Sequence, residues 1–442
     1  MGDVLKVALA NLVLKLPSLT VGILGQDTSK PQFVQVSSIQ LEHHLLCIED
    51  GSCDPNAWDT RLLGMLQDQH DQLWPSIESR PPWRVIVIKW TPSGVDSHLV
   101  LDVVFAVHHS LADGRSTGVF HSMLLEELNS SRGPPAQLVG NTLMITGTCK
   151  LPHPQEKVIR FTISWAFFLK TLWHELTPTW LHPQSLERPW TGSVITCEPC
   201  HTRLRLVTVS ATLVPQLLAT CRQYQTTLTP LLHILVLVSL ARRLAPHEAQ
   251  AFRSSTPIDL RPFASDTFQD SNQKIPFGVY VTAQSHFFDA SVLASLRTLG
   301  EEAIKNGTVW KMAAKLRSQM KQRLDSLPKD DITSLLGWVS DWKGFWLSKV
   351  GQSRNDTWEV SNIGLIPTTN ITDSDGWKIQ RCIMSQGASV AGAAVNISVA
   401  GVPRGDICIA LGWQDGIVGT GIIDGLAHDL RGWLNRLSQK MA

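Results

Sequence analysis

Residues 99–114 read LVLDVVFAVHHSLADG, and this stretch decides the fold of the chain. Its first part, Leu99 to Val107, is an almost unbroken apolar run, which is typical of a strand buried on both faces. His109, Asp113 and Gly114 follow directly after that run. The stretch therefore places a base-capable side chain at the end of a core strand, with a carboxylate and a flexible residue close behind it.

A helix is expected immediately after this stretch. Apolar residues recur there at helical spacing, at Val119, Phe120, Met123, Leu124 and Leu128. Ser116 is the expected N-cap of this helix. The polar residues therefore lie in a strand-to-helix connection, where proteins often carry catalytic groups on a rigid scaffold.

Length and composition exclude several classes of protein. The 442 residues suffice for two ordinary domains, and 43% hydrophobic with 17% charged residues describes a globular chain. The formal net charge of +1 gives no reason to expect a polyanionic partner, so nucleic acid is not expected to bind. We expect a monomer in the cytoplasm, although the sequence does not fix the oligomeric state.

Neither targeting nor a membrane span is predicted. Asp3 stands where a secretory signal needs basic residues, and the apolar run 231–240 is too short to cross a bilayer, so we expect no transmembrane segment and a buried helix there. The cysteines are expected to be reduced thiols. Residues 197–201, CEPCH, match a haem-attachment pattern literally, but one isolated motif with a proline inside it is best interpreted as a coincidence.

Strand and helix patterns recur along both halves. They predict a mixed α/β (α+β) chain built from two layered domains, with residues 1–150 and 201–442 as the domains and 151–200 as a crossover. A TPSG sequence at 91–94 predicts a hairpin between the strands 83–90 and 98–107, and residues 133–156 are expected to be a linker. The active loop is expected to face an active-site tunnel at the junction of the two domains.

The residue types at 108–114 suit acyl transfer. A neutral imidazole at His109 can take a proton from a hydroxyl or an amine while that atom attacks a carbonyl, and Asp113 could orient the ring or brace the loop. No G-x-S-x-G pattern is present, so direct transfer is favoured over a covalent acyl-enzyme. On these residues alone, two histidines that end a strand before an ordinary turn are the favoured interpretation.

Several stretches resemble the CoA-dependent acyltransferase superfamily, which includes chloramphenicol acetyltransferase, the plant BAHD enzymes and peptide-synthetase condensation domains. Its HxxxDG signature is matched by His109 to Gly114. The remainder is similar to the fungal alcohol acetyltransferase branch, and the likeness covers most of the chain. It rests on Trp190-Thr191-Gly192, on Thr227 to His233, on Pro257-Ile258-Asp259-Leu260-Arg261-Pro262 and on Val360 to Gly364.

This resemblance implies roles for individual residues. His109 matches the general base, Asp113 the structural aspartate of the catalytic motif, and Arg261 the arginine that pairs with that aspartate and braces the loop. Gly114 is expected to leave room for the acyl donor. Ser361, Asn362 and Ser385 are the candidates for oxyanion or substrate contacts, and no metal site is expected.

The resemblance also implies an activity. It predicts transfer of an acyl group, in particular acetyl, from acyl-CoA as a co-substrate to a hydrophobic alcohol of fungal secondary metabolism, with no permanently bound cofactor. Sixteen Trp against two Tyr suggest a pocket lined by indoles. Residues 411–416 match the plant hallmark only weakly, which argues against the plant branch.

Alternatives stay open. The same fold could carry out N-acylation, transfer from a carrier protein or a cyclisation, and a binding protein that retains the scaffold is a third interpretation. The aromatic segment 161–181 could lie on a membrane surface, but its few basic residues favour a helix packed on the protein.

Overall fold

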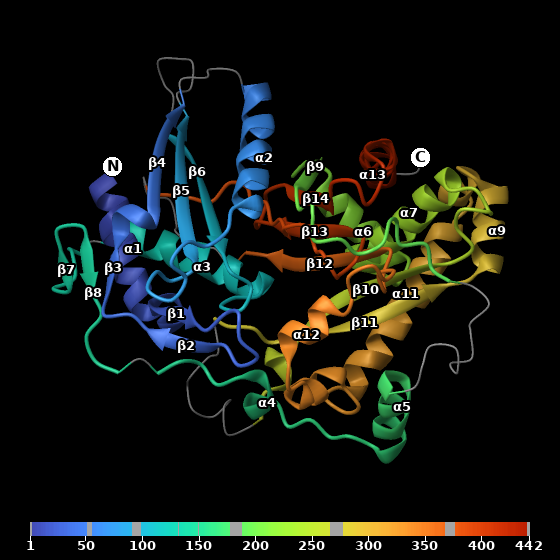
Figure 1. Cartoon of the computed structure of the whole chain (residues 1–442). Helices are drawn as coiled ribbons and strands as arrows, with labels where there is room; N and C mark the ends of the chain where they lie inside the picture. Colours follow the sequence, from blue (N-terminus) through green and yellow to red (C-terminus); the bar gives the residue numbers. More distant parts are fainter. Residues whose placement is uncertain are drawn as a thin grey trace.

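The computed structural model describes residues 2–50, 55–90, 99–130, 132–148, 150–176, 188–265, 277–366 and 376–439. It is a mixed α/β structure with a six-stranded sheet, two three-stranded sheets and a two-stranded sheet among these residues. The three-stranded sheet β4-β5-β6 and the six-stranded sheet lie side by side (Figure 1). This confirms the α/β fold class, while the boundaries at residues 150 and 200 stay predictions.

The sheet of the first half carries the HxxxDG sequence at the end of its strand β6. Strand β5 (Trp83–Trp90) pairs in parallel with β4 (Leu45–Asp50) and antiparallel with β6 (Val100–Val107). Helices α1 (Gly2–Lys15) and α3 (Gly114–Leu128) cover one face of this sheet, and α2 (Pro55–Asp71) covers the other. The predicted turn at 91–94 lies outside the described residues, but the antiparallel pairing of β5 and β6 agrees with a hairpin.

Short elements surround this sheet. They are η1 (Pro17–Thr20), β1 (Val21–Leu24), β2 (Gln32–Gln35), β3 (Ser38–Gln40), η2 (Leu41–His43), β7 (Leu138–Val139) and β8 (Thr142–Met144). Strand β8 pairs with both β3 and β7, so the segment expected to be a linker contains two short strands.

The second half is built on the six-stranded sheet. Its order is β11 (Val281–Phe288), β10 (Phe252–Asp259), β12 (Trp358–Leu365), β13 (Val395–Gly401), β14 (Ile407–Gln414) and β9 (Thr202–Val209). The helices that pack on one face are α6 (Val214–Gln223), α7 (Leu228–Arg243), α9 (Ala290–Leu299), α10 (Glu302–Lys305), α11 (Thr308–Ser326) and α13 (Thr420–Ser438). Figure 1 shows these helices gathered on the side of the sheet away from β4-β5-β6.

Alternation along β12 separates the two faces of this sheet. Trp358 and Val360 are fully buried in the apolar core beneath the helices. Glu359 and Ser361, at the intervening positions, line a cavity on the opposite face. Because side chains of a strand alternate between faces, the sheet has one apolar side and one side that offers polar groups to the cavity.

Helix α7 is the buried helix expected from the run 231–240, since nearly all its side chains lie in the core. No single described helix is long and apolar enough to cross a membrane. Among the described helices, only α6 and α7 taken together have the length and apolar composition of a span, and they are bent by 90° at their junction.

The aromatic segment 161–181 is less buried than expected. It contains α5 (Trp165–Leu176), whose Trp165 and Trp173 are 79% and 57% exposed. The short helix α4 (Gln155–Val158) precedes this segment. Phe168 of α5 contacts the exposed Trp338 of η5 (Ile332–Trp338) at a ring-centroid distance of 5.5 Å. The expectation of a helix packed on the protein stays a prediction.

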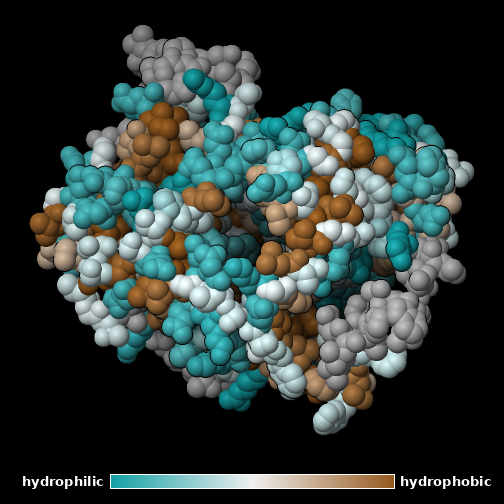
Figure 2. All heavy atoms as spheres, in the orientation of Figure 1, coloured by the Kyte–Doolittle hydropathy of each residue, from teal (hydrophilic) through white to brown (hydrophobic). Residues whose placement is uncertain are grey.

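Two further differences have clear physical reasons. The N-cap of α3 is Asp113, not Ser116, because its carboxylate accepts a hydrogen bond from the Ser116 N–H at 2.9 Å. The apolar spacing of residues 293–305 predicts one helix, but Gly300, whose φ is +52°, divides it into α9 and α10. The sequence patterns did not predict α2, β4, β11 or the short helix α12 (Trp342–Leu347). In Figure 2, hydrophobic (brown) atoms gather on the surface where Figure 1 shows α12.

Candidate active site

The loop that follows β6 presents His109 to the cavity. The backbone of the loop is held at both sides, since the His108 N–H donates to the Pro82 carbonyl at 2.9 Å and the Leu111 N–H donates to the His108 carbonyl at 3.0 Å. The His109 side chain is exposed and lines the cavity, and it forms no hydrogen bond with another described residue. Both ring nitrogens of His109 are therefore open to ligands.

His108 has a different environment. Its Nδ1 lies 2.8 Å from the hydroxyl of Ser110 and accepts the Ser110 N–H at 3.3 Å, which closes a local turn. Burial lowers the pKa of the His108 imidazole, and the neighbouring charge of His109 lowers it further. His108 and Ser110 thus stabilise the turn.

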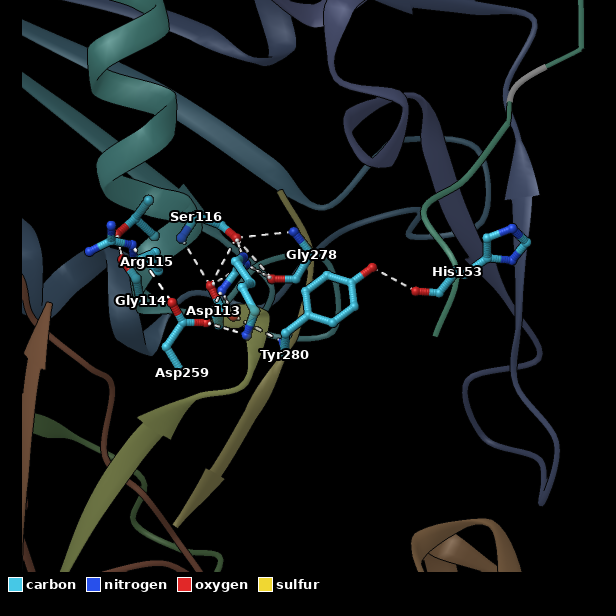
Figure 3. A network of polar contacts seen from close by, with 10 residues as sticks. Asp113, Gly114, Arg115, Ser116, His153, Asp259, Gly278 and Tyr280 are labelled. Atoms are coloured by element: carbon cyan, nitrogen blue, oxygen red, sulfur yellow. Dashed lines mark hydrogen bonds and ion pairs between the residues drawn. The ribbon is translucent and has the colours of Figure 1, made fainter. Parts of the chain in front are cut away.

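The carboxylate of Asp113 is surrounded by hydrogen-bond donors (Figure 3). Arg261 donates through Nη1 to Oδ2 at 2.9 Å and through Nη2 to Oδ1 at 3.1 Å. The backbone N–H of Tyr280 donates to Oδ2 at 3.0 Å and that of Ser116 to Oδ1 at 2.9 Å. These four N–H groups occupy all the lone-pair sites of a carboxylate, so Asp113 has none left to orient the His109 ring.

The contact between Asp113 and Arg261 predicted from the sequence is thus present. Burial alone would raise the pKa of Asp113, but the hydrogen bonds and charge of Arg261, with the Tyr280 and Ser116 N–H groups, bring that pKa below its usual value. Burial works against the Arg261 cation as well, and Asp113 and Asp259 together raise its pKa. Each charge is stabilised in the interior by the other.

Further contacts connect this ion pair to both halves of the chain. Arg261 also binds Asp259 at 3.0 Å and lies over the ring of Tyr280, whose hydroxyl donates to the His153 carbonyl at 2.6 Å (Figure 3). Ser116 accepts from the Gly278 N–H at 3.0 Å. The loop that carries His109 is therefore braced by residues more than a hundred positions away in sequence.

A cavity of about 2390 Å³ opens in front of His109. Its walls come from α2, β6 and α3 of the first half, and from β12 and residues 376–389 of the second half. Figure 2 shows the molecular surface hollowed near the middle of the displayed face. A cavity between the two halves is thus present, and its continuity as a tunnel stays a prediction.

The three candidate contact residues are placed differently. Ser361 and Ser385 line the cavity, and the Ser385 hydroxyl lies 2.8 Å from Nε2 of His70 on α2. Asn362 is directed elsewhere: its amide donates to the Thr229 hydroxyl at 3.0 Å and its carbonyl accepts the Gly364 N–H at 2.9 Å. Neighbouring positions on a strand point to opposite faces, so Ser361 and Asn362 could not both reach the cavity.

Gly114 lines the cavity at the start of α3. A Cβ added to Gly114 would lie 2.7 Å from Cε of Met384 and 2.9 Å from Cγ2 of Ile363, so the glycine allows two apolar side chains to approach the helix. The room that Gly114 leaves for an acyl donor stays a prediction.

Several residues of the cavity were not predicted from the sequence. His70 lies on the unrecognised helix α2, and Gln386 lies in a segment without regular structure that crosses the sheet. Residues 359–363 have a strand pattern, in which Glu359 and Ser361 share one face, and this spacing is the signal that could have found Glu359. Indoles contribute Trp58, Trp74, Trp90 and Trp377 to the walls, while the other described tryptophans lie elsewhere.

Among the described residues, no group of three or more His, Cys, Asp or Glu side chains could hold a metal ion. Cys197 and Cys200 of the haem-like motif are exposed and free.

Acid is expected to destabilise the protein through its buried histidines. Burial lowers the pKa of His44, His70, His121 and His286 from 6.5 to about 4 in each case. The unfolded chain therefore binds protons below pH 6.5 that the folded chain excludes until about pH 4, so stability is complete above 6.5 and falls through this window. Glu359, whose pKa burial raises to about 7, opposes this trend only in part. Urea unfolding at a series of pH values measures the effect, and an unchanged free energy of unfolding between pH 7 and pH 4 contradicts it.

Comparisons with known proteins agree with this arrangement. Residues 69–420 match the alcohol acetyltransferase family. A probable alcohol acetyltransferase, FCK4 of Fusarium pseudograminearum, is 30% identical over 434 residues, which cover 97% of this chain and 85% of the relative.

Solved structures share the fold. The structure of TRI3 trichothecene 15-O-acetyltransferase from Fusarium sporotrichioides superposes on this chain with a TM-score of 0.65 and 11% sequence identity. The alignment covers 99% of this chain and 86% of TRI3. The epimerization domain of tyrocidine synthetase B has a TM-score of 0.51 at 14% identity, with 99% of this chain and 89% of the domain aligned. These likenesses confirm the acetyltransferase and condensation-like fold. Because the family match spans most of the sequence, the chain belongs to the alcohol acetyltransferase family and is an acyltransferase.

Proposed function

We propose that this enzyme transfers an acetyl group from acetyl-CoA to the hydroxyl of an apolar alcohol, with His109 as the general base. The observation that carries the proposal is the open imidazole of His109 in the large cavity, on a loop that the Asp113–Arg261 ion pair braces. Acetyl-CoA acts as a co-substrate, and no permanently bound cofactor is required.

The proposed reaction needs no covalent enzyme intermediate. The His109 imidazole takes the proton of the alcohol as its oxygen attacks the thioester carbonyl. The tetrahedral intermediate then collapses, the carbon–sulfur bond breaks, and the imidazolium returns the proton to the CoA thiolate. The products are an acetate ester and CoA, and the imidazole is regenerated.

The cavity provides groups for both substrates. Its volume of about 2390 Å³ exceeds the ~300–1,000 Å³ of a typical small-molecule pocket, which suits a site holding donor and acceptor together. The hydroxyls of Ser361 and Ser385 line the same cavity and are the proposed donors to the oxyanion of the intermediate.

The direct test is to incubate the full chain with acetyl-CoA and a panel of primary alcohols with matched primary amines. We expect CoA thiol release coupled to an acetate ester, measured by a thiol reagent and by product mass. Preferential amide formation would instead establish N-acylation. Binding of the alcohols without consumption of acetyl-CoA would overturn the proposal, and transfer only from a carrier-bound acetyl group would replace the donor.

A further inference from the structure

Glu359 is an acid in the cavity for which the proposed reaction has no use. It lies on β12 two residues before Ser361, and both residues line the cavity together with His109. Its neighbours across the sheet are Ser255 of β10 and Asn396 of β13, both neutral. The carboxyl group therefore faces a cavity wall made of polar residues without a basic one beside it in the sheet.

The carboxyl group of Glu359 also lacks a strong partner. Its one hydrogen bond is from the Gln386 amide to Oε1 at 3.5 Å, the outer limit for such a bond, and the same amide donates to the Ser398 hydroxyl at 3.2 Å. No Lys or Arg of the described residues forms an ion pair with Glu359, whereas Asp356, three residues earlier, binds Arg253 at 2.9 Å.

Other acids of the cavity have partners. Asp113 is saturated by N–H donors, and Asp59 binds Arg381 at 2.6 Å. Asp102 accepts the indole N–H of Trp90 at 2.7 Å, and Asp406 accepts the Ala211 N–H at 2.8 Å. Glu359 is thus the described cavity acid with the weakest set of protein donors.

The weak hydrogen bonding of the Glu359 carboxyl lowers the stability of the folded protein unless a ligand donates a further hydrogen bond to it. Burial raises the pKa of Glu359 to about 7, the Gln386 amide lowers it slightly, and the charge of Asp356 adds to the rise. A half-buried carboxyl with one long hydrogen bond is less stable than one whose oxygens are fully hydrogen-bonded. A bound molecule with an N–H or O–H group at this place would recover that free energy, and a cationic group would recover most because hydrogen bonds between charges are the strongest.

The acceptor is the substrate that fits this requirement. The phosphates of CoA are anions, which a carboxylate repels, so Glu359 disfavours that end of the donor. Resting on the proposed function, we propose that Glu359 is a specificity-determining residue that binds a second hydrogen-bond-donating group of the acceptor alcohol, an amine or a hydroxyl, beside its apolar body. The preferred substrates are then amino alcohols or diols and not simple alkanols.

Matched acceptors test this inference. The probes are straight-chain alkanols from butan-1-ol to decan-1-ol, each with its ω-hydroxy and ω-amino counterpart, and the readout is kcat/KM with saturating acetyl-CoA. For the wild type we expect preference for the bifunctional member at one chain length by about tenfold or more, the size of one hydrogen bond to a charged group. Glu359→Gln should keep the preference for the diol and lose that for the amino alcohol, and Glu359→Leu should lose both.

Control measurements separate the possible failures. Asp415→Asn removes an equally charged acid outside the cavity, at the exposed ion pair with Arg203, and should leave the preference unchanged. The KM for acetyl-CoA should be the same in all variants. Equal preference in the wild type and both Glu359 variants overturns the inference while the proposed function stands. A changed KM for acetyl-CoA with an unchanged acceptor preference would place Glu359 at the donor and also overturn it.

A binding measurement makes the inference independent of turnover. Calorimetry with the ω-amino alcohols alone should give at least tenfold tighter binding to the wild type than to Glu359→Leu. If no acceptor is acetylated, the proposed function fails, and this difference in affinity still decides whether Glu359 binds a donor group. The midpoint of thermal unfolding of both variants should match or exceed that of the wild type, because each replaces a half-buried acid that has no strong partner.

Discussion

Replacement of His109 by Gln is expected to lower kcat for acetyl transfer by about two to four orders of magnitude, the usual contribution of a general base. Glutamine keeps the approximate size and polarity of the side chain but cannot take a proton from the attacking hydroxyl. The His109 imidazole is exposed and makes no hydrogen bond with another described residue, so the folded structure should be unaffected. Steady-state rates with acetyl-CoA and the best alcohol of the panel measure the loss.

His108 provides the matched control for this experiment. It is adjacent in sequence, but its Nδ1 is engaged by Ser110 in the turn. His108→Gln should therefore change kcat by no more than a few-fold. If His109→Gln keeps the wild-type rate with an unchanged unfolding midpoint, the assignment of the base is wrong.

Replacement of Asp113 by Ala is expected to destabilise the protein by about 3 kcal/mol, because it leaves Arg261 as an incompletely paired cation in the interior. The side chain of Arg261 is only 14% exposed, although Asp259 at 3.0 Å keeps it partly compensated. The substitution also removes the N-cap of α3, which contributes about 1 kcal/mol of that loss. Urea unfolding followed by tryptophan fluorescence measures the difference.

Two comparisons make this prediction specific. Asp415→Ala breaks an exposed ion pair with Arg203 and should cost less than about 1 kcal/mol. The double substitution of Asp113 by Leu and Arg261 by Met should cost less than the sum of its single replacements, because neither partner is then left alone. A loss for Asp113→Ala as small as that for Asp415→Ala would show that the buried pair does not stabilise the loop.

The sequence predicted the elements whose patterns are set by burial. Strands β5 and β6 and helix α7 lie close to their expected ranges, because their apolar side chains need a core. Helix α2 was missed since its polar residues hide the periodicity, and it carries His70 into the cavity. The segment around Gln386 has no regular structure, so no pattern in the sequence could place it on the sheet.

Within the candidate site, local chemistry and long-range contacts differ in how well they can be predicted. Both Ser116 and Asp113 are good N-cap residues, and only the direction of the backbone decides between them. The pairing of Asp113 with Arg261 came from the resemblance to a family, because their separation of 148 residues leaves no local signal. The orientation of Asn362 away from the cavity depends on the register of β12, which the sequence did not define.

The partnership of Asp113 and Arg261 also has a consequence for folding. A nascent chain that has not yet produced residue 261 contains His109 but not the cation that holds its loop. Contacts this distant in sequence form slowly, since the intervening chain must first be closed into a loop. Competence for acyl transfer should therefore appear only when the second half has folded onto the first, which protects a partly made enzyme from consuming its donor.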